Sequence, residues 1–321
     1  MTEKLKQLNF SFIVPVYNEE KNISLLYSGI NNLMEKIQQE WELIFVNDGS
    51  KDNSLQILRE YSLKDKRVKY ISLSRNFGHQ IALTAGFDYV SHQSDATISL
   101  DCDLQDPIEI IEEMINKWKE GYDIVYARRK NRYDSFLKKY SAVFYYKILD
   151  QFSEINIPIN VGDFRLIDKK VLCNLKGMRE KARYLRGMVA WLGFKAAFVD
   201  FERHERKYGN TNYTFKKMFN LAMDGLINFS FLPLKIGLLL GIVSINLGTL
   251  MILYMIIDTI INNADYPLYK WLVIILFIFI GFQFMLMWIL GEYIARIYDE
   301  SRQRPLYIVE EEINFNENSD A

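Results

Sequence analysis

The sequence predicts an α/β fold in which a Rossmann-like, mostly parallel sheet precedes two long apolar helices. Short runs rich in β-branched and aromatic residues alternate with segments of helical periodicity in the first half of the chain, which is typical of parallel sheets. Polar clusters directly follow three of these runs. Two stretches without any charged residue then occupy much of the last third of the chain. These observations predict a ligand-binding sheet joined to a membrane segment.

The composition is that of a folded protein, with 50% hydrophobic and 25% charged residues among 321. The 39 basic and 40 acidic residues leave a net charge of −1, so no global field favours nucleic acid and any anion site must be local. Cys102 and Cys173 lie far apart without a CxxC motif, as expected of ordinary thiols in a reducing compartment. The first ten residues lack the apolar segment of a signal peptide, which agrees with that compartment.

Strands and helices alternate from the first apolar run onward. The predicted strands are Phe10–Tyr17, Leu43–Asn47, Val68–Leu73 and Thr97–Asp101. The helices between them each carry one apolar face, formed by Ile23, Leu26, Ile30, Leu33 and Ile37, then by Leu55, Leu58 and Tyr61, and then by Ile81, Ala85 and Tyr89. Strands joined by helices in this way pair in parallel through crossover connections.

The polar clusters lie where ligands bind in such sheets, beyond the carboxyl ends of the strands. They comprise Tyr17–Glu19, Asn47–Ser50 and Asp101–Asp103. The last of them begins the segment DCDLQDP, which places Asp101, Asp103, Gln105 and Asp106 within six positions. Carboxylates crowded after a buried strand need water, a partner or a cation.

Asp106 is predicted to cap a helix that starts at Pro107 and has Ile108, Ile111, Ile115 and Trp118 on one face. That structural role leaves Asp101, Asp103 and Gln105 for chemistry. Carboxylate and amide oxygens suit Mg²⁺ or Mn²⁺ rather than structural zinc. Taken alone, the DxD pattern is equally compatible with a solvated acidic loop.

Two charge-free runs, of 22 residues at 236–257 and of 21 residues at 271–291, are each long enough to cross a bilayer as a helix. Basic residues flank the outer ends of the pair, at Lys235, Arg296, Arg302 and Arg304, whereas the connecting segment has only Lys270. The positive-inside rule therefore places both ends, and the preceding domain, in the cytoplasm.

Four regions follow from these patterns: a cytoplasmic α/β domain at 1–210, an amphipathic juxtamembrane region at 211–233, a two-helix hairpin at 234–298 and an acidic tail at 299–321. The helical pattern of Thr214–Phe231 suits either the headgroup region or packing on the domain. The segment Lys181–Phe194, which mixes basic and aromatic residues, is expected to be interfacial. The tail after Leu306 is expected to be disordered.

Six motifs, in order, carry a family resemblance: FIVPVYNEE, VNDGSKDNS, LSRNFGHQIALTAGFDYV, LDCDLQDP, GDFRL and RKYGN. Their order, spacing and strand-end context resemble family 2 glycosyltransferases of the GT-A fold. With the paired apolar runs, the chain more narrowly resembles the membrane-anchored polyisoprenyl-phosphate glycosyltransferases, the group that includes dolichol-phosphate mannose synthase and bacterial undecaprenyl-phosphate glucosyltransferases. The resemblance covers nearly the whole chain.

The resemblance implies a role for each strand-end cluster. Nucleotide-sugar binding falls to Pro15, Tyr17, Asn18, Glu19, Asp48 and Asp101, and metal binding to Asp103 and Gln105. The implied cofactor is Mg²⁺ or Mn²⁺, which would bridge the donor's two phosphates. Asp163 matches the family's candidate base or acceptor-orienting carboxylate, so the catalytic set is Asp163, Asp101 and Arg165. Arg165 is expected either to pair with Asp163 or to contact phosphate.

Arginines are the natural partners for the phosphate of a lipid acceptor, because guanidinium groups bind phosphate oxygens in bidentate fashion. Arg128, Arg129 and Arg206 are the expected contacts, with charged surface as the alternative for each. The chain departs from the family after RKYGN, where Thr211-Asn212 replaces a common Ser-Lys pair. The missing lysine puts part of the phosphate contact in doubt.

The implied activity is inverting transfer of a sugar from a UDP-sugar, UDP-glucose or UDP-N-acetylhexosamine, to undecaprenyl phosphate at the cytoplasmic leaflet of the plasma membrane. No residue decides which sugar is transferred. The resemblance also implies a homo-oligomer, a tetramer in relatives. A membrane-anchored enzyme acting on a soluble or polysaccharide acceptor is the alternative. A processive polysaccharide synthase would carry a QxxRW motif and more spans, and an inactive scaffold would have lost Asp48, Asp101, Asp103 or Asp163.

Overall fold

The computed structural model describes residues 7–130, 160–202 and 267–315, with single positions at 158 and between 246 and 261. Contacts divide the chain into two compact units. Unit 1 comprises Met1–Lys147, Ile155–Met218 and Arg304–Ala321, and unit 2 comprises Ile148–Glu154 and Phe219–Gln303.

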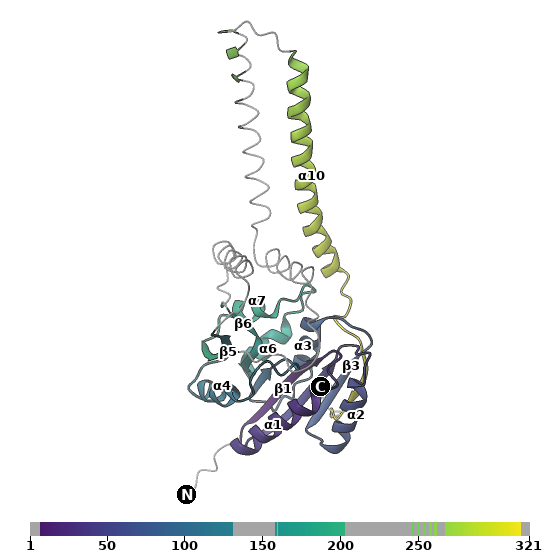
Figure 1. Ribbon diagram of the computed structural model, residues 1–321, viewed down its shortest axis with the longest axis vertical. Coiled ribbons are helices and arrows are strands. Elements are labelled where there is room, and N and C mark those ends of the chain that lie inside the picture. Colours follow the sequence, from purple (N-terminus) through teal and green to yellow (C-terminus); the bar gives the residue numbers. More distant parts are fainter. Residues whose placement is uncertain are drawn as a thin grey trace. The chain divides into compact units, whose positions relative to one another are not determined.

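The described residues of unit 1 form an eight-stranded sheet of order β7-β5-β6-β4-β1-β2-β3-β8 (Figure 1). The strands are β1 (Asn9–Val16), β2 (Glu40–Asn47), β3 (Val68–Leu73), β4 (Ala96–Ser99), β5 (Ile124–Arg129), β6 (Val161–Asp168), β7 (Ala196–Phe201) and β8 (Val309–Ile313). Strand β1 pairs in parallel with β2 and β4, β2 with β3, and β5 with β7. The antiparallel pairs are β3 with β8, and β6 with β4 and β5. The predicted α/β fold with a mostly parallel sheet is confirmed.

Helices cover both faces of this sheet, because side chains along a strand point alternately to each face. They are α1 (Ile23–Ile37), α2 (Ser54–Lys64), α3 (His79–Asp88), α4 (Ile110–Lys119), α6 (Lys169–Gly177) and α7 (Leu185–Trp191). Phe10, Phe12 and Val14 of β1 share a buried cluster with residues of α1 and α4. Ile13 points the other way, and a Cβ at Gly86 of α3 would lie 2.3 Å from its side chain. The glycine therefore permits the close seating of α3 on the sheet.

Helix α4 begins at Ile110, with Glu109 as its N-cap, so the prediction that Asp106 caps a helix starting at Pro107 is wrong. The intervening residues form a turn, in which the Ile111 N–H donates to the Ile108 carbonyl at 3.1 Å. The predicted apolar face is confirmed at Ile111 and Ile115, which are both buried.

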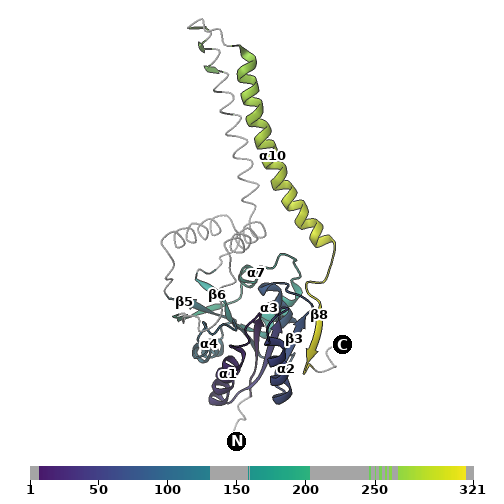
Figure 2. The same ribbon diagram turned by 45° about the vertical axis from the view of Figure 1, so that its right-hand side comes forward.

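The acidic tail is ordered over residues 309–313, which corrects the expectation of disorder after Leu306. These residues form β8, which pairs antiparallel with β3 and closes that edge of the sheet (Figure 2). Arg59 donates two hydrogen bonds to Glu311, at 3.0 and 2.5 Å, and the Tyr89 hydroxyl donates to Glu312 at 2.5 Å. Pairing with β3 satisfies the backbone of the tail, Arg59 compensates the charge of Glu311, and the Tyr89 hydroxyl binds Glu312.

The described part of unit 2 is dominated by α10 (Leu268–Ser301), a helix of 34 residues. It contains the whole predicted span 271–291 and begins early enough to include Lys270, which the sequence had assigned to a connecting loop. Among the described residues, no helix is long and apolar enough to cross a membrane. The juxtamembrane region 211–233 and most of the predicted span 236–257 lie outside the described residues.

Candidate active site

The ends of β1 and β2 are tied together by the first polar cluster. Asn18 has a left-handed backbone, with φ of 57°, and its side-chain oxygen accepts from the Lys51 N–H at 2.8 Å. Its own N–H donates to the Ser50 hydroxyl at 3.0 Å, and the Glu19 N–H donates to the Ser54 hydroxyl at 3.0 Å. Pro15 is buried within β1 opposite Val46. These contacts give the strand-end loops one defined arrangement.

Asp48 is buried at the end of β2 and holds the loop before α3. Its two carboxylate oxygens accept from the N–H groups of Phe77, at 2.7 Å, and Gly78, at 3.0 Å. Burial raises the pKa of Asp48, while these two hydrogen bonds oppose the rise. Gly49 lets the two loops approach closely, since a Cβ there would lie 2.7 Å from backbone atoms of Arg75 and Asn76. Asp48 thus fixes the entry to α3 and the position of His79.

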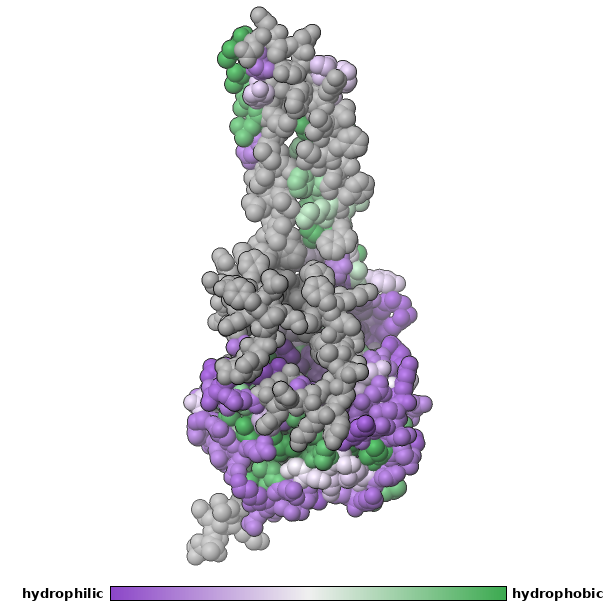
Figure 3. All heavy atoms as spheres, in the orientation of Figure 1, coloured by the Kyte–Doolittle hydropathy of each residue, from purple (hydrophilic) through white to green (hydrophobic). Residues whose placement is uncertain are grey.

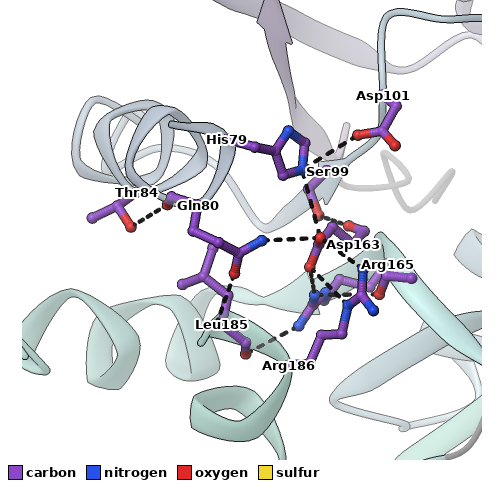
Figure 4. Close-up of polar contacts among 10 residues, drawn as sticks. His79, Gln80, Thr84, Ser99, Asp101, Asp163, Arg165, Leu185 and Arg186 are labelled. Atoms are coloured by element: carbon purple, nitrogen blue, oxygen red, sulfur yellow. Dashed lines mark hydrogen bonds and ion pairs between the residues drawn. The ribbon is translucent and has the colours of Figure 1, made fainter. Parts of the chain in front are cut away.

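Asp163 lies at the centre of a polar cluster near the ends of β4 and β6 (Figure 4). Arg165 Nη2 contacts its Oδ1 at 2.5 Å, and Arg186 Nη2 contacts its Oδ2 at 3.1 Å. Gln80 Nε2 also donates to Oδ2 at 3.1 Å. His79 Nε2 lies 3.5 Å from Asp163 Oδ2 and 3.5 Å from Asp101 Oδ1, so the imidazole links the two carboxylates.

Backbone groups fix the other members of the cluster. The Ser99 hydroxyl, on β4, donates to the Asp163 carbonyl at 2.5 Å. Arg165 Nη1 donates to the Leu185 carbonyl at 3.2 Å, and the Leu185 N–H donates to Gln80 Oε1 at 3.0 Å. Strands β4 and β6 and helices α3 and α7 therefore converge on Asp163 (Figure 4).

The charges of the cluster set its protonation. Burial alone would raise the pKa of Asp163, but Arg186, His79 and Arg165 hold it well below its ordinary value. Burial alone would lower the pKa of His79, but Asp101 and Asp163 raise it to about 9. At neutral pH the cluster thus holds an ionised Asp163 beside an imidazolium.

The predicted metal ligands lie on the loop that follows Asp101. Leu104, between them, has a φ of 58°, and the Gln105 N–H donates to Asp103 Oδ1 at 3.1 Å. No group of three or more His, Cys, Asp or Glu side chains able to hold a metal occurs within the described residues. A carboxylate and an amide are hard oxygen donors that suit Mg²⁺ or Mn²⁺, and their small number fits an ion that takes its remaining ligands from a diphosphate and water.

Arg128, one of the three predicted acceptor arginines, pairs with Asp200 rather than with Asp163. Arg128, at the end of β5, contacts Asp200 of β7 through Nε at 2.6 Å and through Nη2 at 3.0 Å, and its guanidinium lies 5.0 Å from the Phe198 ring centre. The guanidinium of Arg129 lies near Gly162, where a Cβ would be 3.4 Å from Nη2. Arg206 lies outside the described residues.

His79, Gln80 and Arg186 have no individual role in the sequence interpretation, yet each contacts Asp163. The signal for the first two was their place in the quoted motif LSRNFGHQ, directly before a helix. Arg186 lies in the segment Lys181–Phe194, which was expected to be interfacial without any residue being singled out. Their separation from Asp163 along the chain hides the contact from any local pattern.

The family model Glycosyl transferase family 2 matches residues 11–175. The chain is 46% identical over 306 residues to the uncharacterized glycosyltransferase YkcC of Bacillus subtilis, covering 95% of this chain and 94% of that protein. It is 38% identical over 306 residues to the bactoprenol glucosyl transferase of Shigella phage SfV, covering 95% and 99%.

Among solved structures, glucosyl-3-phosphoglycerate synthase from Mycobacterium tuberculosis, in complex with Mn²⁺ and UDP-glucose, matches with a TM-score of 0.47 and 16% identity. The match covers 67% of this chain and 76% of that one. The two sequence relatives, by contrast, match over at least 94% of each chain.

Proposed function

Because the chain belongs to glycosyl transferase family 2, we propose that it transfers glucose from UDP-glucose to bactoprenol (undecaprenyl) phosphate. Family membership makes it an inverting hexosyltransferase. One observation supports the proposal that the acceptor is a lipid. The match to a bactoprenol glucosyl transferase extends over 95% of this chain, far beyond residues 11–175, which the family model matches. UDP-N-acetylhexosamine is the other donor that the sequence leaves open.

In this reaction a phosphate oxygen of the acceptor attacks the anomeric carbon of glucose. The bond between that carbon and the diphosphate oxygen breaks, and UDP leaves with the bonding electrons. A phosphate monoester is already ionised at neutral pH, so it needs no strong general base. The low pKa of Asp163 agrees with this, since a carboxylate that binds protons weakly serves better as a fixed negative charge. Positioning and charge compensation then supply most of the catalysis.

The donor's diphosphate is proposed to bind near the loop 101–105. Asp103 and Gln105 would hold Mg²⁺ or Mn²⁺ there, and the ion when bound stabilises the negative charge of the leaving UDP. Asp101 is proposed to contact the sugar nucleotide, and His79 fixes the orientation of its carboxylate at 3.5 Å. Asp48 contributes by placing the loop that precedes His79.

We place the enzyme at the plasma membrane, with unit 1 on the cytoplasmic side. The charge-free runs 236–257 and 271–291 and their flanking basic residues support this topology. A tetrameric assembly stays a prediction from the resemblance.

The test is a transfer assay with purified protein, undecaprenyl phosphate, Mg²⁺ or Mn²⁺ and a panel of radiolabelled UDP-sugars. We expect label from UDP-glucose to enter the organic phase and to be released as glucose by mild acid. Label found only in water-soluble product would overturn the lipid acceptor and favour a soluble or polysaccharide acceptor. Label from UDP-N-acetylglucosamine alone would overturn the donor.

A further inference from the structure

The three cationic side chains that contact Asp163 differ in their access to solvent. The side chain of Arg165 is 2% exposed, whereas those of His79 and Arg186 are 29% and 24% exposed. Arg165 is therefore the internal counterion of the buried carboxylate. His79 and Arg186 both contact Asp163 and are also partly exposed to solvent.

The contacts of Arg186 fix its guanidinium in one orientation. Nε lies 3.4 Å from Asp163 Oδ1 and Nη2 lies 3.1 Å from Oδ2, so one edge of the planar group faces the carboxylate. A guanidinium has five N–H donors in a rigid fork, and this geometry suits oxyanions with more than one oxygen. An arginine held in place loses less rotamer entropy when it binds an anion.

The surroundings of His79 add positive potential at the same place. His79 is the first residue of α3, and the N-terminus of a helix favours anions through the peptide dipoles. The group formed by Asp101, Asp163, His79, Arg165 and Arg186 carries a net charge of +1 when the imidazole is protonated. An anion that enters beside Asp163 is therefore met by compensating charge.

Arg128 is a weaker candidate for the same task. Both of its contacting nitrogens face the Asp200 carboxylate, and its guanidinium lies over Phe198. Arg186 likewise directs Nε and Nη2 at one carboxylate, that of Asp163, so the two arginines differ in what surrounds them and not in being already paired. His79, by contrast, lies 3.5 Å from Asp101, where the donor sugar is proposed to bind, and His79 and Arg186 both contact Asp163.

We propose that Arg186 and His79 together form a seat for a phosphate group, and that Asp163 holds the two cations in place rather than acting as a base. This inference rests on the proposed function, in which both substrates carry phosphate. The phosphate comes either from the lipid acceptor or from the donor's diphosphate, and the same seat chemistry serves both.

The test compares Arg186→Gln, Arg186→Lys and His79→Gln with the unchanged protein and with Arg179→Gln. Arg179 is a matched control, since it contacts a carboxylate, Asp88, through Nη1 at 2.9 and 2.8 Å, apart from the cluster. Dissociation constants are measured without turnover, by calorimetry for UDP and by thermophoresis in detergent for undecaprenyl phosphate. Melting temperatures verify that each variant is folded.

We expect Arg186→Gln to weaken one of the two ligands about 10-fold or more, with partial recovery in Arg186→Lys and no change in Arg179→Gln. Weaker binding of undecaprenyl phosphate with normal binding of UDP assigns the seat to the acceptor. Weaker binding of UDP with normal binding of undecaprenyl phosphate assigns it to the donor. Normal binding of both ligands by folded Arg186→Gln and His79→Gln would overturn the seat. A fall in turnover alone, with both dissociation constants unchanged, would also overturn it.

The same measurements separate this inference from the proposed function. If the unchanged protein binds both ligands but transfers no glucose, the proposed function fails. The dissociation constants of the variants still test whether Arg186 and His79 bind phosphate. If transfer proceeds normally in Arg186→Gln and His79→Gln with unchanged KM for both substrates, the seat fails and the function stands.

Discussion

Two arginine–aspartate pairs lie on neighbouring strands of the sheet and have almost equal contact distances. Arg165 and Asp163 on β6 are 2.5 Å apart, and Arg128 on β5 and Asp200 on β7 are 2.6 Å apart. The first pair is almost fully buried, whereas the side chains of the second are 44% and 36% exposed. On the face drawn in Figure 3, hydrophilic residues surround smaller hydrophobic patches on the coloured part of unit 1. The comparison shows that distance alone does not measure what an ion pair contributes.

Exposure to solvent explains why the two ion pairs differ in their contribution to stability. An exposed pair gains little, because water and salt screen both charges whether or not they touch. A buried pair costs desolvation energy to form, and removal of one partner leaves the other charge without compensation in a medium of low dielectric. Three cationic side chains, those of Arg165, Arg186 and His79, compensate the buried charge of Asp163. Two of them, Arg186 and His79, are partly exposed to solvent.

The largest expected effect is that of Arg165→Met, which removes the internal counterion of Asp163. We expect the free energy of unfolding to fall by about 3–5 kcal/mol, as for other broken buried pairs. Thermal or urea denaturation of the purified chain measures it. A melting temperature equal to that of the unchanged protein would show that Arg186 and His79 alone compensate Asp163.

Asp103→Asn examines a carboxylate at the same end of the sheet that lies outside the buried cluster. We expect turnover to fall by about 100-fold or more, because a neutral amide binds Mg²⁺ or Mn²⁺ more weakly than the charged carboxylate it replaces, while the melting temperature stays the same. A transfer assay across a range of metal concentrations measures this. Near-normal turnover at low metal concentration would contradict the metal assignment.

Asp48→Asn examines a buried carboxylate whose partners are neutral backbone N–H groups. An amide nitrogen would face one of these donors, so we expect a loss of about 1–3 kcal/mol of stability in the loop before α3. Hydrogen exchange of the Phe77 and Gly78 N–H groups reports it directly. Unchanged protection of both groups would mean that the loop does not depend on the carboxylate.

Because of His79, the stability that the buried Asp163 cluster contributes depends on pH. Its folded pKa of about 9 lies above the ordinary value of about 6.5, so its stabilising contribution is complete below the ordinary value and is lost as the pH rises through about 9. We expect the melting temperature to fall between pH 7 and pH 10, and His79→Gln to remove most of that slope. An equally steep slope in the variant would assign it to other groups.

The smallest expected effect is that of Arg128→Gln, which breaks the exposed pair. We expect a change of at most about 1 kcal/mol in the free energy of unfolding, smaller still at high salt. Denaturation at low and high ionic strength measures it. A loss as large as that of Arg165→Met would remove the distinction between the two pairs.

Local patterns predicted much of the fold. The strand Val68–Leu73 was predicted to the residue, and the apolar face of α1 is buried at Ile23, Leu26 and Ile30. These features depend on periodicity within a few turns, which a sequence displays directly. The start of α4 was wrong because the segment DP favours a helix start at Pro107, whereas residues 108–111 first form a turn.

Of the site, only the residues to which the family resemblance assigns a role were predicted. The contact of Asp163 with Arg165 was one of the two expectations for Arg165, because the two residues lie two positions apart in the motif GDFRL. The convergence of His79, Gln80 and Arg186 was not, because tertiary packing brings these distant segments together. The order of the tail was missed for a related reason. Five residues with three glutamates indicate disorder when they are considered alone, but in the fold Arg59 and Tyr70 contact Glu311.

Strand β8 also has a consequence for biosynthesis. Residues 309–313 are translated long after β3, the strand with which they pair, and Asn314 donates to the carbonyl of Ser62, 252 positions earlier. Until then β3 remains an open edge strand, which is prone to pair with other chains. The sheet is thus completed only after translation of α10, and a chain truncated before residue 309 would leave that edge unprotected for its lifetime.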